Sequence, residues 1–146
     1  MLSFCCDFYS LFLNFSGPFN FEEFHALTSG QKKLFLIELD ERTEGKRLSA
    51  TKLERLTAVY KLREEKNAEV SCVWIVLGLK SHWKGVLDEA KLFVGEIGRM
   101  KFIRPIYRAM YQWPETKQLA VDTFLANKGH MMSLSIAAIK AELHLK

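Results

Sequence analysis

The sequence predicts an all-α protein, and three observations support that prediction. Apolar residues recur at helical spacing in one segment after another from Thr28 onward. Residue types that favour helix N-caps, namely Thr28, Ser49 and Asn67, precede the first three of these segments. The joins are polar and roughly two to six residues long, which makes neighbouring helices antiparallel, and no second strand pattern offers pairing. About seven helices stacked in antiparallel pairs form a bundle or an α-solenoid.

The first two helices are each predicted from a capping residue and an apolar face. Thr28 and Gln31 have the spacing of a capping box, and this helix is expected to end near Glu41. Ser49 is expected to cap the next helix. The predicted inward faces comprise Leu34, Phe35 and Leu39 in the first helix, and Leu53, Leu56 and Tyr60 in the second.

The segment that follows Asn67, with the sequence AEVSCVWIVLGLK, is ambiguous between strand and helix. Its valine and isoleucine content suits a buried strand. The spacing of Val70, Val73, Trp74 and Leu77 instead fits one face of a helix, and no partner strand is apparent. The period therefore favours a helix.

Four more helices are predicted in the second half of the chain. Gly98 is expected to end the fourth helix in the left-handed conformation, and Pro105 is expected in the first turn of the fifth. Pro114 restarts the chain for the sixth helix, and Ser133 is expected to cap the last. The predicted inward faces are Trp83, Leu87, Ala90, Val94 and Ile97; Ile103, Ile106, Tyr107 and Met110; Leu119, Ala120 and Phe124; and Leu134, Ala138, Ala141 and Leu145.

Length and composition fit one domain with an ordinary core. The chain has 146 residues, of which 49% are hydrophobic and 26% charged. A net charge of +4 is a weak argument for a polyanionic partner, so nucleic acid is not expected. The three cysteines form neither a disulfide framework nor a metal motif, which predicts a reducing compartment. We expect a cytoplasmic location, with the nucleus or nucleolus as the alternative.

Residues 1–18 form an apolar, phenylalanine-rich segment, distinct from the helical domain expected over residues 19–146. Phe4, Phe8, Phe12 and Phe15 would share one helix face, which calls for a partner surface. The segment is either packed against a neighbouring domain or a non-standard start of the chain. It is too short for a membrane span and lacks the basic start of a secretory signal.

Motifs for autonomous catalysis are missing from the sequence. It contains no HExxH, no GxSxG and no phosphate-binding glycine loop. The four histidines, His25, His82, His130 and His144, are scattered, and none has the spacing of a zinc ligand pair. No catalytic residue, metal ligand or cofactor is therefore assigned to this chain.

One basic stretch stands out, because four cations fall within ten residues and no acid occurs before Glu115. Arg99 and Lys101 lie between two predicted helices, near the start of the second, where backbone N–H groups and the helix dipole favour an anion. Arg104 and Arg108 are four residues apart and would share one face of that helix. A carboxylate, a phosphate backbone, or no ligand at all remain as alternatives on these grounds.

The segment GRMKFIRPIYR resembles the corresponding region of the leukotriene A-4 hydrolase family, which includes aminopeptidase B and aminopeptidase O. The resemblance extends upstream through SATKLERLTAVYKL and NAEVSCVWIVLGLKSHWKGVLDEAKLFVGEIG, and downstream from KQLAVDTFLANKGHM to the C-terminus. It covers roughly residues 21–146, with aminopeptidase O as the nearer member.

The resemblance implies a superhelical, armadillo- or HEAT-like C-terminal domain that packs on a zinc-bearing catalytic domain. It assigns binding of the substrate carboxylate to Arg99 and Lys101, and it gives no such role to Arg104 or Arg108. Zinc would belong to the catalytic domain of the parent aminopeptidase, and this chain would be inactive alone. The hypothesis is thus a non-catalytic accessory domain of a zinc aminopeptidase; the alternative is a stand-alone helical scaffold for protein–protein interaction.

Overall fold

The computed structural model describes residues 21–146 and confirms the all-α prediction for them. These residues form eight α-helices and contain no strand, which is one helix more than expected because a short helix precedes Thr28. The predicted stripe of phenylalanines between residues 1 and 18 lies outside the described residues. The helices are α2 (Phe21–Ala26), α3 (Ser29–Arg42), α4 (Ala50–Val59), α5 (Ala68–Lys80), α6 (Leu87–Glu96), α7 (Met100–Gln112), α8 (Lys117–Asn127) and α9 (Ser133–Glu142).

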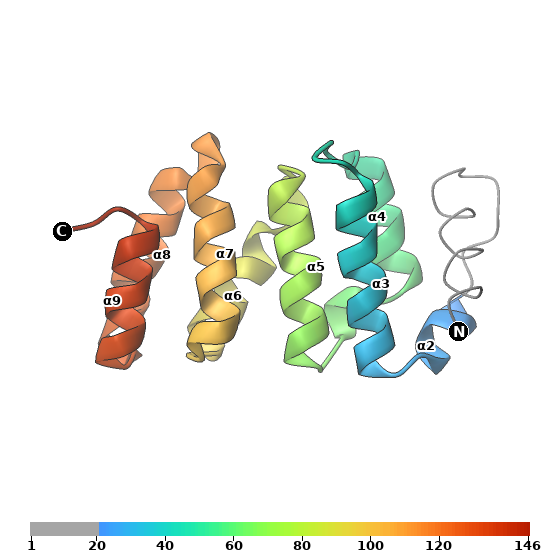
Figure 1. The fold of residues 1–146 in the computed structure, drawn as a ribbon, viewed down its shortest axis with the longest axis horizontal. Helices are drawn as coiled ribbons and strands as arrows, with labels where there is room; N and C mark the ends of the chain where they lie inside the picture. Colours follow the sequence, from blue (N-terminus) through green and yellow to red (C-terminus); the bar gives the residue numbers. More distant parts are fainter. Residues whose placement is uncertain (1–20) are drawn as a thin grey trace.

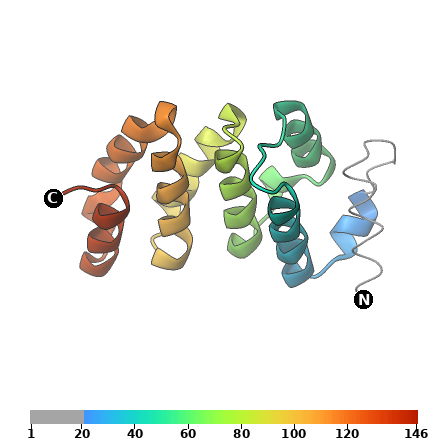
Figure 2. The same ribbon diagram turned by 45° about the horizontal axis from the view of Figure 1, so that its top comes forward.

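The helices from α3 onward form two layers. Helices α3, α5, α7 and α9 stand side by side in one layer, and α4, α6 and α8 lie behind them (Figures 1 and 2). Within the front layer every helix begins at the same edge, the lower one in Figure 1. The N-termini of α3, α5 and α7 therefore lie along one side of the molecule. A superhelical, armadillo- or HEAT-like course of the whole stack stays a prediction.

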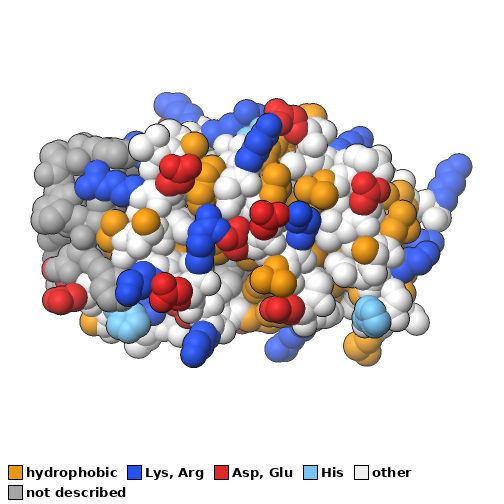
Figure 3. Space-filling model, turned by 180° about the vertical axis from the view of Figure 1, so that it is seen from behind, with side chains coloured by type: hydrophobic (Ala, Val, Ile, Leu, Met, Phe, Trp, Pro, Cys, Tyr) orange, Lys and Arg blue, Asp and Glu red, His pale blue; other side chains and the backbone are white. Residues whose placement is uncertain are grey.

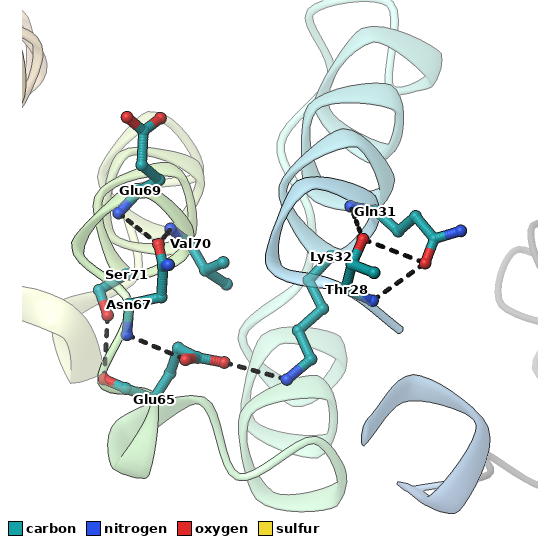
Figure 4. A network of polar contacts seen from close by, with 8 residues as sticks. All are labelled: Thr28, Gln31, Lys32, Glu65, Asn67, Glu69, Val70 and Ser71. Atoms are coloured by element: carbon teal, nitrogen blue, oxygen red, sulfur yellow. Dashed lines mark hydrogen bonds and ion pairs between the residues drawn. The ribbon is translucent and has the colours of Figure 1, made fainter. Parts of the chain in front are cut away.

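The predicted caps fix where α3, α4 and α5 begin. Thr28 and Gln31 form the expected capping box: the Gln31 N–H donates to Thr28 Oγ1 at 3.3 Å and the Thr28 N–H donates to Gln31 Oε1 at 2.9 Å. Ser49 Oγ accepts from the Lys52 N–H at 3.3 Å. Asn67 caps α5 with its side-chain oxygen, as Figure 4 shows. Each cap satisfies backbone donors that the first helical turn leaves without a partner.

Helix α5 is central, and its burial explains why a valine-rich segment is helical. It packs between α3 and α7, and Val70, Trp74 and Leu77 are each at most 2% exposed. The buried Trp74 indole donates to Thr57 Oγ1 at 3.1 Å, which ties α5 to α4. Contacts on nearly all sides override the modest strand preference of valine and isoleucine.

Helix α7 buries the predicted face, but it begins earlier than expected. Ile103, Ile106, Tyr107 and Met110 are fully buried. Because the helix starts at Met100, Pro105 stands inside it and not in its first turn. The missing proline N–H therefore does remove a donor from the helix interior, contrary to the prediction.

Four further predictions for chain turns and faces were wrong. Gly98 has no positive φ; α6 ends because Ile97 is extended, with φ −107° and ψ 106°. Ser133 is the first helical residue of α9, and Met132 takes the N-cap position without a side-chain hydrogen bond. The inward face of α9 consists of Ser135, Ile139 and Leu143, whereas Leu134 is 70% exposed and Ala141 is also exposed. In α3, Leu34 is 55% exposed, and Phe35, Leu36 and Leu39 are buried.

The back of the molecule, on the side of α4, α6 and α8, carries both charged and apolar side chains. Figure 3 shows this side, with apolar atoms in small groups between lysines, arginines and acids.

Within residues 21–146, none of the helices has the length and apolar character needed to cross a membrane.

Candidate functional site

The candidate site is the start of helix α7. Arg99 is its N-cap residue, in an extended conformation with φ −74° and ψ 119°, and no side chain caps the helix. In the first turn the Phe102 N–H donates to the Arg99 carbonyl oxygen at 2.9 Å, whereas the N–H groups of Met100 and Lys101 have no hydrogen-bond acceptor among residues 21–146. These two donors are left to solvent or to a ligand, at the positive end of a helix of 13 residues. This confirms that Arg99 and Lys101 stand at a helix start.

Both cations lie near the aromatic ring of Phe102. The Arg99 guanidinium carbon lies 5.9 Å from the ring centroid, and Lys101 Nζ lies 5.4 Å from it. Phe102 is 8% exposed and packs edge-to-face on Phe93 with centroids 6.4 Å apart. At these distances the ring contributes weak cation–π attraction to each of the two exposed cations.

Arg99 and Lys101 differ in their partners. Arg99 is exposed and forms no ion pair with any residue in the described range 21–146. Lys101 Nζ is ion-paired with Oε1 of Glu69, in the first turn of α5. The other oxygen, Glu69 Oε2, accepts from Lys33 Nζ of α3 at 2.5 Å. These two lysines lower the pKa of the Glu69 carboxyl from 4.5 to about 2.

Arg104 and Arg108 have a different environment, although they belong to the same basic stretch. As predicted, they share one face of α7, and both donate to Glu142 at the end of α9. Arg108 binds it with two parallel hydrogen bonds of 2.7 Å each, and Arg104 Nε donates at 2.5 Å. These hydrogen bonds lower the pKa of Glu142 to about 2. The two arginines therefore join α7 to α9.

The scattered histidines form no metal site in the part of the chain that the structure describes, where no group of three His, Cys, Asp or Glu side chains is close enough to hold an ion. His82 adopts a left-handed φ of 56° and stacks on Trp113 with ring centroids 4.8 Å apart. Its pKa is lowered, chiefly by desolvation.

A surface groove of about 470 Å³ adjoins the site between α3, α5 and α7. Lys33, Glu69 and Lys101 line one part of it, together with Phe102 and Pro105. Neither Glu69 nor Phe102 was predicted from the sequence to belong to the site. Phe102 directly follows Lys101 in the sequence, so its neighbourhood could have been noticed. Glu69 is 32 residues from Lys101, and no local pattern links them.

Fold and site together define an all-helical domain with an uncapped, cationic helix start. The family model described as leukotriene A4 hydrolase, C-terminal, matches residues 27–143. The chain therefore belongs to the leukotriene A4 hydrolase C-terminal domain family.

Relatives of this chain are hydrolases and aminopeptidases by name. Leukotriene A-4 hydrolase of Xenopus laevis is 30% identical over 131 residues, covering 88% of this chain and 21% of that protein. Leucine aminopeptidase 2 of Emericella nidulans is 37% identical over 108 residues, covering 73% and 16%. That of Aspergillus fumigatus is 31% identical over 124 residues, covering 84% and 19%. The chain thus spans about a fifth of the length of these relatives. Their names do not single out aminopeptidase O.

Proposed function

We propose that this chain is a non-catalytic accessory domain of a zinc aminopeptidase, and that it packs on the catalytic domain and anchors the carboxylate end of the peptide substrate. Arg99 is the principal anchor, and Lys101 assists it. Family membership and the aminopeptidase names of the relatives support the enzyme class. The coverage of about a fifth of each relative supports a role beside a larger catalytic part.

The observation that carries the anchoring role is the state of Arg99. It is an exposed arginine at an uncapped helix N-terminus, without an ion pair to any described residue. A guanidinium offers two parallel donors that match a carboxylate, and the helix start adds backbone donors and a favourable dipole. Lys101 is less available, because Glu69 already holds its ammonium group.

Anchoring requires that the site lose its water. An exposed ion pair contributes about 0–1 kcal/mol, because solvent screens it. A charge-assisted hydrogen bond in a desolvated site contributes about 1.5–3 kcal/mol. The catalytic domain would supply that desolvation by covering the start of α7. We assign the zinc chemistry to that domain as well, as membership of the family implies.

The test uses an aminopeptidase that carries this domain and compares peptide substrates with a free or an amidated C-terminus. Arg99→Ala should lower kcat/KM on the free acids roughly ten- to hundredfold, by loss of a charge-assisted hydrogen bond. The same change should affect the amides little, because they lack the partner charge.

Arg47→Ala is the matched control. Arg47 is an exposed arginine in the loop after α3, at the opposite end of the front layer, and has no carboxylate partner in the described part of the chain. Its removal should leave both substrate series unchanged. Equal losses on acids and amides for Arg99→Ala would show a structural role and refute the anchoring.

A further inference from the structure

Glu69 stands next to the proposed anchor without belonging to the basic stretch. Its position is fixed by the start of α5, where Asn67 Oδ1 accepts from the Glu69 N–H at 2.9 Å and from the Val70 N–H at 3.4 Å. Figure 4 shows the Glu69 carboxylate directed away from Asn67 and from Glu65. An acid in the first turn is favoured by the helix dipole, so Glu69 needs no lysine to be stable there.

The same edge holds a second acid–lysine pair of a different kind. Glu65 Oε2 accepts from Lys32 Nζ at 3.3 Å, and these side chains are only 16% and 12% exposed. Glu65 also accepts from the Asn67 N–H at 3.0 Å, which makes it part of the local structure at the start of α5 (Figure 4). The Glu69 cluster is more open: its side chain is 33% exposed, and that of Lys101 is 56% exposed.

We propose that Glu69 is a specificity-determining residue of the anchoring site. Its carboxylate is ion-paired with Lys101 and competes with the ligand carboxylate for that lysine. Arg99 is therefore the main group that binds the ligand. This proposal rests on the function proposed above. Glu69 is ion-paired with Lys101 from α7 and with Lys33 from α3, so one carboxylate neutralises part of the charge that the site would offer to a ligand.

The consequence is a site that binds carboxylates less tightly than its cations allow. A carboxylate that reaches Lys101 must share the ammonium group with Glu69 or displace it. The low pKa of Glu69, about 2, keeps this counter-anion charged at every physiological pH. Replacing Glu69 by the neutral, isosteric glutamine frees Lys101 and removes a nearby negative charge.

The experiment measures binding of N-acetyl-dialanine and of its C-terminal amide to an aminopeptidase that carries this domain, by isothermal titration calorimetry. Glu69→Gln should tighten binding of the acid about two- to fivefold, the range expected for an exposed pair. Binding of the amide should not change. In the Lys101→Met variant, Glu69→Gln should not tighten binding of the acid, because there is no ammonium group to release. This double-mutant cycle isolates the coupling between the two residues.

Glu65→Gln is the control for charge. It removes a carboxylate from the same helix start but releases Lys32, which is not part of the site, so acid binding should change little. If Glu69→Gln leaves acid binding unchanged or weakens it, while Arg99→Ala still abolishes the preference for the acid, Glu69 only positions Lys101 and the proposal is overturned. If no variant, Arg99→Ala included, alters a preference for acid over amide, the anchoring function fails as well.

Discussion

The two halves of the basic stretch carry the same charge but have different roles. At the start of α7, Arg99 has no ion pair with a described residue, and Lys101 shares one half-buried acid, Glu69, with Lys33. Further along the same helix, Arg104 and Arg108 are both ion-paired with a single acid, Glu142, whose side chain is only 12% exposed. Position along the helix decides the outcome, because the first turn lies at the open edge of the layer and the later turns face α9.

The largest expected effect on stability comes from the acid between the two arginines. Glu142→Ala should destabilise the chain by about 1–2 kcal/mol, because it removes three charge-assisted hydrogen bonds and leaves two arginines without a partner. Urea unfolding measures this change. Glu96→Ala is the matched control: Glu96 is the last residue of α6, is exposed and lacks an ion pair among residues 21–146, so its loss should cost less than about 0.5 kcal/mol.

Arg108→Ala should have a smaller effect, about 0.5–1 kcal/mol. Its guanidinium supplies two of the three hydrogen bonds to Glu142, but the side chain is 47% exposed and solvent screens the pair. Arg104 still holds the acid in this variant. A loss as large as that of Glu142→Ala, measured by the same unfolding experiment, would mean that Arg104 contributes nothing.

The pH dependence should distinguish the two acids. Folding lowers the pKa of both Glu142 and Glu69 to about 2, from 4.5 in the ordinary case. A lowered pKa contributes stability that is fully present above about pH 4.5 and is lost as the pH falls towards 2. Glu142→Gln should reduce this loss of stability at acid pH more than Glu69→Gln does, because the Glu142 side chain is less exposed than that of Glu69. Unfolding midpoints between pH 6 and pH 2.5 provide the measurement.

Arg99→Ala should change stability least, by less than about 0.5 kcal/mol, because the side chain is exposed and its described contact is the one with the Phe102 ring. Thermal unfolding of the chain checks this. A loss above 1 kcal/mol would place Arg99 with Arg104 and Arg108 as a structural residue and remove the contrast between the two halves.

Some local features of the fold were predictable from the sequence, although the local predictions for Gly98 and Ser133 were wrong, and long-range contacts were not predictable. The caps at Thr28, Ser49 and Asn67 act within three residues, so their patterns are visible in the chain. The face of α9 was misjudged because apolar residues occur on several sides of that helix, and only its contact with α7 decides which are buried.

The same distinction holds for the site. The position of Arg99 and Lys101 at a helix start follows from local spacing, and their proposed role from family resemblance. Glu69 and Glu142 lie more than 30 residues from the cations that they bind, and only the packing of α5 and α9 against α7 brings them there. Pro105 was misplaced because a helix that tolerates an interior proline begins earlier than the proline rule predicts.

The most direct test compares Arg99→Ala with Arg108→Ala in one enzyme that carries this domain, using the ratio of kcat/KM on free-acid and amidated peptides. We expect Arg99→Ala to lower this ratio roughly ten- to hundredfold, whereas Arg108→Ala should leave it unchanged and lower only the unfolding free energy. An unchanged ratio in Arg99→Ala, or an equal fall in both variants, would contradict the division of this basic stretch into an anchoring half and a structural half.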